Sequence, residues 1–283
     1  MSEPTTIRHA IAAISRQLAA CGDGRIGEYY AWQLVMKVTG KSREELMVQR
    51  PFVIEPDQQQ ELALLVRECV VNNKPLQYIL KSVDFADLTL EVEPPVLIPR
   101  PETEWWVTLL MEQLSPFVAR ATKNEPFTVL DLCTGTGCVG LALASMSGHV
   151  RVVGVDINPA AVALAFRNAQ RNGIENITFF ESDLYQSLPP SMSFDCIVAN
   201  PPYISSNEYG KLPPEIKDWE DKQALWADDE GLSVVRRIVM GASARLNRRF
   251  DTQLCCEIGS RQGEIVKGLF KDHGFTGSVV QKD

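Results

Sequence analysis

The chain has 283 residues, of which 45% are hydrophobic and 23% charged, as in an ordinary soluble globular protein with one large and one small domain. No apolar run reaches the roughly 18–20 residues of a membrane span, so we expect no membrane partner. The net charge is −8, and residues 1–85 balance ten basic against ten acidic side chains, so the rest of the chain is acidic and we expect no direct nucleic-acid partner.

The first 75 residues are predicted to form a small helical domain. Apolar residues recur at helical spacing between Ile7 and Leu18. Ser42 followed by Glu45 is a capping-box pattern that opens a further helix. No catalytic pattern falls in this part, so its functional role would be to dock a partner.

The rest of the chain is predicted to be a connector, residues 76–100, and a Rossmann-like domain, residues 101–283. Side chains alternate over 83–92, which favours a β-hairpin in the connector. Strands are expected near 127–132, 150–156, 176–181, 194–200 and 252–258, and helices near 137–146, 159–172, 231–246 and 261–272. This alternation predicts a mostly parallel sheet with helices on both faces, and the polar segment 203–229 is expected to be a loop beside the active site.

A glycine-rich turn follows the first strand of this domain. Gly135, Gly137 and Gly140 match the pattern G-x-G-x-x-G, and Asp156 ends the next strand, 21 residues after Gly135. This fingerprint leaves a nicotinamide dinucleotide and other nucleoside cofactors open. The seven cysteines include no CxxC pair, so we expect reduced thiols and no metal site.

Asp131 favours one of these cofactors. It lies four residues before the first glycine, where a carboxylate would repel a pyrophosphate but suits a cofactor with an ammonium and a sulfonium group. S-adenosylmethionine fits, and its product would be S-adenosylhomocysteine. Asp156 can then accept both ribose hydroxyls, while Asp183 and Leu184 offer an acceptor for the adenine amino group beside an apolar wall.

Asn200, Pro201, Pro202 and Tyr203 directly follow the apolar run 196–199. Because prolines lack the N–H that a sheet ladder needs, the strand ends in a rigid turn. This turn presents an amide, a free proline carbonyl and an aromatic face, which together suit a planar NH₂ group. We predict that Asn200, Pro201 and Tyr203 are catalytic and that all four residues bind substrate; the alternative is a proline-rich turn without a function.

Together these residues resemble the release factor glutamine N5-methyltransferases of the HemK/PrmC type. Besides the turn at 200–203, the stretch Ile-Pro-Arg-Pro-Glu-Thr-Glu at 98–104 carries the resemblance, which extends over nearly the whole chain. It implies methyl transfer from S-adenosylmethionine to the glutamine side chain in the Gly-Gly-Gln motif of class I peptide-chain release factors. The cofactor-binding residues are then Asp131, Cys133, Thr134, Gly135, Thr136, Gly137, Asp156, Asp183, Leu184 and Asn200.

Some positions depart from the family pattern or stay open. Cys133 replaces a common glycine, and the long loop carries 219–221 where relatives have a Glu-Pro stretch. These departures favour a mitochondrial member over a bacterial, cytoplasmic one, and we expect a monomer. Arg100, Glu102 and Glu104 could fix the connector or shape the substrate entrance, and Trp105 and Trp106 are expected to pack in the core.

Three rival functions remain. An adenine-N6 or guanine-N2 nucleic-acid methyltransferase uses a similar turn, but it needs a basic cleft for a flipped base. A catalytically silent methyltransferase-like protein would not require Asp131 and Asn200 together. A nicotinamide-dependent oxidoreductase would have no use for the turn at 200–203.

Overall fold

The computed structural model describes residues 5–19, 24–48, 53–247, 249 and 253–282, and the chain divides into two compact units. The helical unit comprises Met1–Lys81 with Pro214–Trp219, and the sheet unit comprises Ser82–Pro213 with Glu220–Asp283. The domain bounds given above stay a prediction, since compact units need not coincide with functional domains. Among the described residues, none of the helices combines the length and apolarity that a membrane crossing requires.

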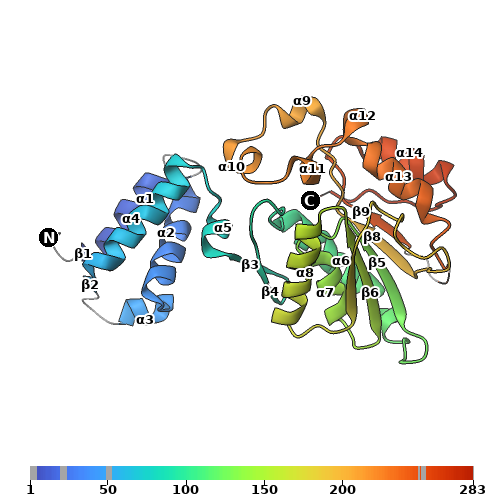
Figure 1. Cartoon of the computed structure of the whole chain (residues 1–283), viewed down its shortest axis with the longest axis horizontal. Coiled ribbons are helices and arrows are strands. Elements are labelled where there is room, and N and C mark those ends of the chain that lie inside the picture. The colour runs from blue at the N-terminus through green and yellow to red at the C-terminus, as the bar shows by residue number, and fades with distance from the viewer. Residues whose placement is uncertain (1–4, 20–23, 49–52, 248, 250–252, 283) are drawn as a thin grey trace. The chain divides into compact units, whose positions relative to one another are not determined.

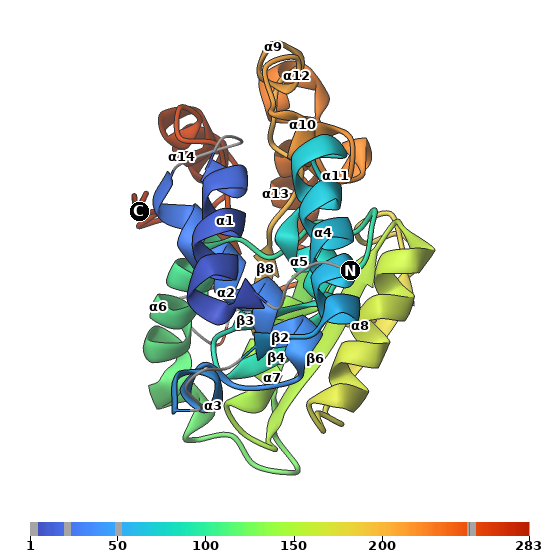
Figure 2. The ribbon, with the colours of Figure 1, turned by 90° about the vertical axis from the view of Figure 1, so that its left-hand side faces the viewer.

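The helical unit contains α1 (Ile7–Ala19), α2 (Gly24–Thr39), α3 (Arg43–Val48), α4 (Pro56–Val71), α5 (Leu76–Leu80) and α10 (Pro214–Lys217), with short strands β1 (Thr5–Thr6) and β2 (Val53–Ile54). Helices α1, α2 and α4 pack side by side (Figures 1 and 2). Ile11, Leu34 and Leu62 belong to the core between them. The predicted capping box is confirmed, since Glu45 accepts from the Ser42 N–H at 2.7 Å. The antiparallel β1–β2 pair was not predicted, because two-residue strands show no periodicity.

The sheet unit is built on a five-stranded parallel sheet with the order β7-β6-β5-β8-β9 (Figure 1). Its strands are β5 (Phe127–Leu132), β6 (Val150–Asp156), β7 (Ile177–Glu181), β8 (Cys196–Ala199) and β9 (Leu254–Cys256). Its longer helices are α6 (Pro101–Val118), α7 (Cys138–Ser145), α8 (Pro159–Arg171), α13 (Ser233–Ala242) and α14 (Gly263–Asp272). The predicted parallel α/β fold is therefore confirmed.

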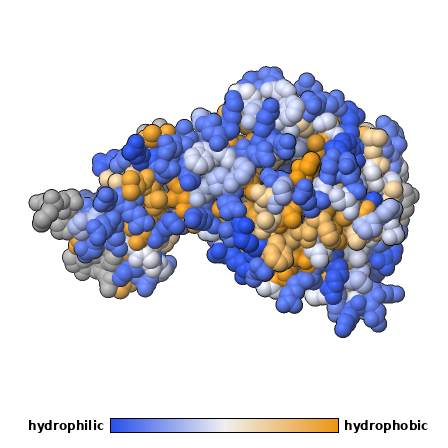
Figure 3. Space-filling view, in the orientation of Figure 1, coloured by the Kyte–Doolittle hydropathy of each residue, from blue (hydrophilic) through white to orange (hydrophobic). Residues whose placement is uncertain are grey.

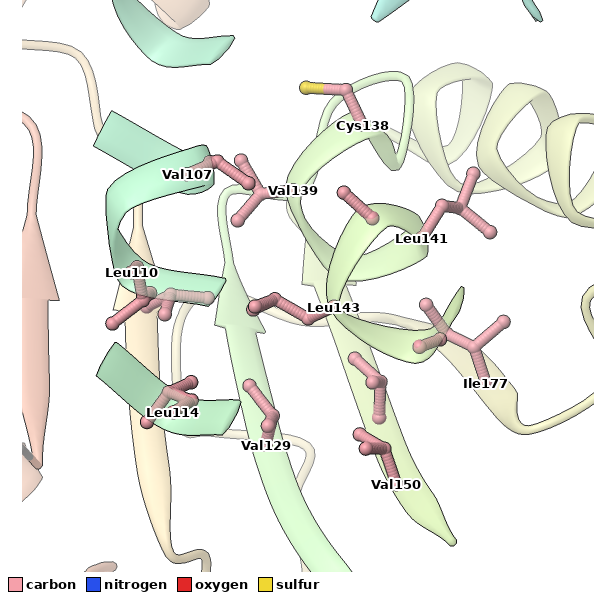
Figure 4. Packing of buried hydrophobic residues seen from close by; sticks show 14 of the residues in the cluster. Val107, Leu110, Leu114, Val129, Cys138, Val139, Leu141, Leu143, Val150 and Ile177 are labelled. Atoms are coloured by element: carbon pink, nitrogen blue, oxygen red, sulfur yellow. The ribbon is translucent and has the colours of Figure 1, made fainter. Parts of the chain in front are cut away.

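The central strand β5 has a core on each face. On one side Val129 packs with Leu110 and Leu114 of α6 and with Leu143 of α7 (Figure 4). On the other side Leu130 belongs to a cluster with Ile238 of α13 and Ile197 of β8. Burial on both faces explains the nearly continuous apolar runs that made these strands recognisable. Burial of one such leucine contributes roughly 1.5–3 kcal/mol to the free energy of folding, and this packing holds the ends of the strands in place.

The predicted hairpin is present as β3 (Ser82–Phe85) and β4 (Leu88–Glu91). Asn168, a fully buried residue of α8, binds its second strand: Oδ1 accepts from the Glu91 N–H at 2.6 Å and Nδ2 donates to the Glu91 carbonyl at 3.0 Å. Nδ2 also donates to the Thr136 carbonyl at 2.9 Å. One side chain thus ties the hairpin to the glycine-rich turn.

The segment 203–229 was expected to be a loop, and the structure corrects this. It forms α9 (Ser206–Tyr209), α10, α11 (Lys222–Leu225) and α12 (Asp228–Gly231). These helices have only four residues each, so they leave no periodic pattern, and α9 begins at a capping box of Ser205 and Glu208. Within the helical unit, Trp219 Nε1 donates to the Asn72 carbonyl at 2.9 Å.

Several large apolar side chains of the sheet unit remain exposed, among them Ile157 after β6, Phe166 on α8 and Phe180 on the edge strand β7. Figure 3 shows apolar side chains gathered on one face of this unit. Ile157 directly follows Asp156, so an apolar surface begins beside that carboxylate.

Candidate active site

The carboxyl ends of the parallel strands bring the candidate residues to one edge of the sheet. Asp131 lies near the end of β5, Asp156 ends β6, Asp183 follows β7, and Asn200 follows β8. Glu257, which follows β9, reaches the same edge through its N–H, which donates to the Ala199 carbonyl at 3.0 Å. Open α/β sheets bind their ligands at this edge.

The glycine-rich turn has the backbone that close approach of a ligand requires. Cys133, Gly135 and Gly137 all have positive φ angles, of 59°, 55° and 84°. A Cβ placed on Gly135 would have no atom within 4 Å, so open space lies beside this residue, whereas one on Gly137 would lie 3.1 Å from the Ala165 side chain. The turn therefore has one glycine that leaves room for a ligand and one that allows helix packing.

Cys133 occupies a left-handed position that a glycine would adopt without strain. Burial raises the pKa of the Cys133 thiol well above its usual value, and the carboxylates of Asp156 and Asp131 raise it further. The thiol is therefore neutral.

The Asp131 carboxylate is buried, and only one of its two oxygens has hydrogen-bond partners among the described residues. Its Oδ2 accepts from the Thr134 hydroxyl at 2.5 Å and from the Gly140 N–H at 3.0 Å. Its Oδ1 is buried and has no hydrogen-bond partner among the described residues. Burial raises the pKa of Asp131 to about 7 despite both hydrogen bonds. A cationic donor placed at Oδ1 would remove this penalty, so the site fits an ammonium group.

Asp156 is held by backbone groups on both oxygens. Its Oδ2 accepts from the Gly135 N–H and its Oδ1 from the Asn158 N–H, each at 2.9 Å. Burial raises the pKa of this carboxyl, while these hydrogen bonds lower it. Each carboxylate oxygen keeps a further lone pair, so the rigid carboxylate can accept two hydroxyls of a ribose.

Asp183 and Leu184 lie after β7 in a locally ordered turn. The Ser182 hydroxyl donates to the Leu184 carbonyl at 2.7 Å, and Leu184 is buried with a φ of 52°. Asp183 Oδ2 pairs with Arg237 of α13 at 2.7 Å and accepts from Gln186 at 3.0 Å. The role of Asp183 as an acceptor for an adenine amine stays a prediction, for which Oδ1 would be the available atom.

Asn200 is oriented by a neighbour that was not predicted. Its Nδ2 donates to the hydroxyl of Thr103, in the first turn of α6, at 3.1 Å. Within the described part of the chain, nothing donates to Asn200 Oδ1 or to the Pro201 carbonyl. The turn therefore presents two free acceptors, as a planar NH₂ group requires.

Glu257 binds both Thr103 and Tyr203. Its Oε2 accepts from the Thr103 hydroxyl at 2.6 Å and from Trp106 Nε1 at 2.8 Å, and its Oε1 accepts from the Tyr203 hydroxyl at 3.1 Å. Burial raises the pKa of Tyr203, and the Glu257 charge adds to this, so the phenol is neutral. Trp106 packs on the core, as expected, but it also donates to this carboxylate. The expectation is wrong for Trp105, which is 40% exposed, because successive helical residues point about 100° apart and cannot both face the core.

Arg100 and Glu104 hold the segments that flank the site. Arg100 Nη2 donates to both carboxylate oxygens of Glu220, whose side chain is 1% exposed, at 2.7 and 2.5 Å. Burial raises the pKa of Glu220, while Arg100 lowers it. Glu104 Oε1 accepts from the Ala86 N–H of the hairpin at 2.7 Å. These contacts favour the role in which Arg100 and Glu104 fix the neighbouring segments over a role in shaping the substrate entrance.

Sequence reasoning missed Thr103, Glu257 and Gln262 as site residues. Gln262 Nε2 donates to the Tyr203 carbonyl at 2.9 Å and so supports the turn. One signal was available, because Glu257 is a charged residue at the end of the last strand of a parallel sheet. In the described residues no cluster of three or more His, Cys, Asp or Glu side chains could hold a metal ion.

Two protein families match the chain. The family described as PrmC N-terminal domain matches residues 9–80, and the one described as Methyltransferase small domain matches residues 108–252.

Similar proteins include three release factor glutamine methyltransferases. That of Geobacter sulfurreducens is 39% identical over 212 residues, which are 74% of this chain and 69% of the relative. That of Thermodesulfovibrio yellowstonii is 32% identical, with 89% of this chain and 87% of the relative covered. That of Vibrio cholerae is 34% identical, with coverage of 98% and 93%. All three organisms are bacteria, so the expected mitochondrial origin gains no support.

Among solved structures, the hMettl16 catalytic domain in complex with a MAT2A 3′UTR hairpin aligns with a TM-score of 0.50 at 15% identity. The alignment covers 85% of this chain and 83% of the other. At this identity the likeness concerns the fold alone.

Proposed function

Because the chain belongs to the release factor glutamine methyltransferase family, we propose that it methylates the glutamine side-chain nitrogen in the Gly-Gly-Gln motif of a class I release factor. The resemblance stated from the residues is confirmed by these matches. One observation supports the assignment of the chemistry to 200–203: Thr103 engages the nitrogen end of the Asn200 amide and leaves its oxygen free.

The residues at the sheet edge fit S-adenosylmethionine, the methyl donor of this family. Asp131 Oδ1 would receive the ammonium group, since it is a buried acceptor without a partner among the described residues. Asp156 would hold the ribose hydroxyls, and the open side of Gly135 would allow the backbone to approach the ligand. When bound, S-adenosylmethionine supplies an electrophilic methyl group on its sulfonium.

The turn at 200–203 would make the substrate amide reactive. An amide nitrogen is a poor nucleophile, because its lone pair is delocalised into the carbonyl. Asn200 Oδ1 and the Pro201 carbonyl would accept its two N–H bonds, which orients the nitrogen and stabilises positive charge that grows on it. Tyr203 would pack against the amide plane. Once alkylated, the nitrogen is strongly acidic and would lose its proton to water without a dedicated base.

The helical domain, residues 1–75, is proposed to dock the release factor and to leave the chemistry to the sheet unit. The protein is proposed to act as a monomer. Because the relatives named above are bacterial, the proposed compartment is the bacterial cytoplasm.

Methyl transfer from radiolabelled S-adenosylmethionine tests the proposal. The substrates are a purified bacterial release factor, its variant with alanine for the Gly-Gly-Gln glutamine, and duplex DNA. We expect label on the unaltered factor only. Asn200→Ala should lower kcat by on the order of 10²-fold or more, because an acceptor and the orientation are lost together. Asn124→Ala, at an exposed asparagine in the loop before β5, is the matched control. Label on DNA would instead support the nucleic-acid methyltransferase alternative.

A further inference from the structure

Asn200, Thr103 and Glu257 are joined by two consecutive hydrogen bonds, and this hydrogen-bond chain is named the relay. Glu257 Oε2 accepts a hydrogen bond from the Thr103 hydroxyl at 2.6 Å, and Thr103 Oγ1 in turn accepts one from Asn200 Nδ2 at 3.1 Å. Thr103 is 1% exposed, so water does not compete for its hydroxyl. The hydroxyl has one proton, and that proton is already donated to Glu257.

The direction of this relay decides which end of the Asn200 amide faces outward. An amide group can rotate by 180° and exchange its oxygen and nitrogen at little steric cost, so only hydrogen bonds select one orientation. Because an ionised carboxylate can only accept, the hydroxyl that donates to it can offer Asn200 nothing but lone pairs. The NH₂ end must therefore face Thr103, which leaves Oδ1 free.

Glu257 is itself held in place from two further elements. Trp106 Nε1, which can only donate, lies 2.8 Å from Oε2, and the Tyr203 hydroxyl lies 3.1 Å from Oε1. Trp106 and Thr103 are three residues apart and share one face of α6. These hydrogen bonds fix the position of the Glu257 carboxylate, because a change of its rotamer would break all of them.

We propose that Glu257, acting through Thr103, is a positioning residue that keeps the Asn200 amide oxygen directed at the substrate NH₂ group. This inference rests on the proposed function and extends it from the turn to α6 and the end of β9. A flipped Asn200 would present an NH₂ group to the substrate NH₂ group, so two donors would meet and the substrate could not be oriented. Glu257 touches no reacting atom in this arrangement.

Two substitutions break the relay at different points. Glu257→Leu removes both acceptor oxygens at similar volume, so the Thr103 hydroxyl is free to donate to Asn200 Oδ1, which permits the flip. Thr103→Val removes the hydroxyl at nearly constant volume. Each should lower kcat for the release factor at least 10-fold with KM changed less than threefold. Affinity for S-adenosylhomocysteine should stay within threefold, because neither side chain belongs to the cofactor set.

A conservative variant and a double variant distinguish a positioning role of Thr103 and Glu257 from a general loss of structure. Thr103→Ser retains the hydroxyl and should restore at least a third of the wild-type kcat. The double variant Thr103→Val with Glu257→Leu should be no slower than the slower single variant, because both changes break one relay. Thr108→Val and Glu112→Gln, at exposed positions of the same helix, are the matched controls and should leave kcat unchanged. Wild-type turnover in Glu257→Leu, or losses that multiply in the double variant, would overturn the proposal.

A direct measurement of the amide does not depend on the substrate. With ¹⁵N-labelled asparagine, the Asn200 side-chain NH₂ should show nuclear Overhauser contacts to the Thr103 methyl group in the wild type. These contacts should weaken or vanish in Glu257→Leu, while Thr108→Val leaves them intact. Identical contacts in wild type and Glu257→Leu would refute the relay. If the wild type fails to label any release factor, the proposed function fails, and this measurement still decides whether the relay orients Asn200.

Discussion

Replacement of Asp131 by asparagine should stabilise the protein above neutral pH while it abolishes tight cofactor binding. The carboxyl is 1% exposed, and burial raises its pKa to about 7. Its ordinary value is 3.8. Because the folded state holds this proton more tightly than the unfolded chain, the contribution of Asp131 to stability falls as pH rises from about 3.8 to about 7 and is then constant.

The difference between 3.8 and about 7, at about 1.36 kcal/mol for each pH unit, corresponds to about 4 kcal/mol. Asparagine resembles the neutral carboxylic acid in shape and in hydrogen bonding. Asp131→Asn should therefore match the wild type near pH 4.5 to within about 1 kcal/mol and exceed it at pH 8 by up to about 4 kcal/mol. Water that reaches the carboxylate reduces this gain, so the figure is an upper value.

Cofactor affinity should change in the opposite direction. Loss of one partner from a buried, hydrogen-bonded charge pair costs about 2–5 kcal/mol, so affinity for S-adenosylhomocysteine should fall by about 30-fold or more. In the wild type, affinity should fall about tenfold between pH 8 and pH 6, because the ionised carboxylate binds the ammonium.

Urea unfolding at several pH values and calorimetry with S-adenosylhomocysteine measure both effects. Asp87→Asn, at an exposed aspartate of the hairpin turn, is the matched control and should show neither. A stability difference between Asp131→Asn and wild type that does not vary with pH would refute the assignment of the raised pKa. Unchanged affinity in Asp131→Asn would refute the ammonium site.

Three further predictions concern residues outside the reaction itself. Arg100→Met leaves the buried Glu220 carboxylate unpaired and should lower the free energy of unfolding by about 3 kcal/mol, measured in urea, while the double variant with Glu220→Leu should recover most of this loss. Asn168→Ala removes three hydrogen bonds of a fully buried amide and should speed hydrogen exchange at the Glu91 N–H; unchanged exchange would show that the hairpin does not depend on it. Tyr29→Ala, at a 59% exposed residue of the helical unit, should raise KM for the intact release factor but not for a short Gly-Gly-Gln peptide, and an equal effect on both would contradict the docking role.

The sequence by itself determined the features that are encoded locally. Strands β5 and β8 are buried on both faces, so their apolar runs predicted a parallel sheet and the edge at which ligands bind. The glycine-rich turn and the turn at 200–203 were recognisable because glycine and proline restrict the backbone through their own covalent structure. These turns directly follow strands, and chain order alone placed them together.

Only the tertiary structure decided which side chains support those turns. The bonds that hold Asn200 and Thr103 join residues 97 and 154 positions apart, and the Arg100–Glu220 pair spans 120 positions. Contacts at such separations leave no periodic trace in a single sequence, and neither do the four-residue helices of 203–229, which depend on local caps. A strand pattern predicts where a side chain lies along the sheet, but the partner of a buried hydrogen bond depends on which elements pack together.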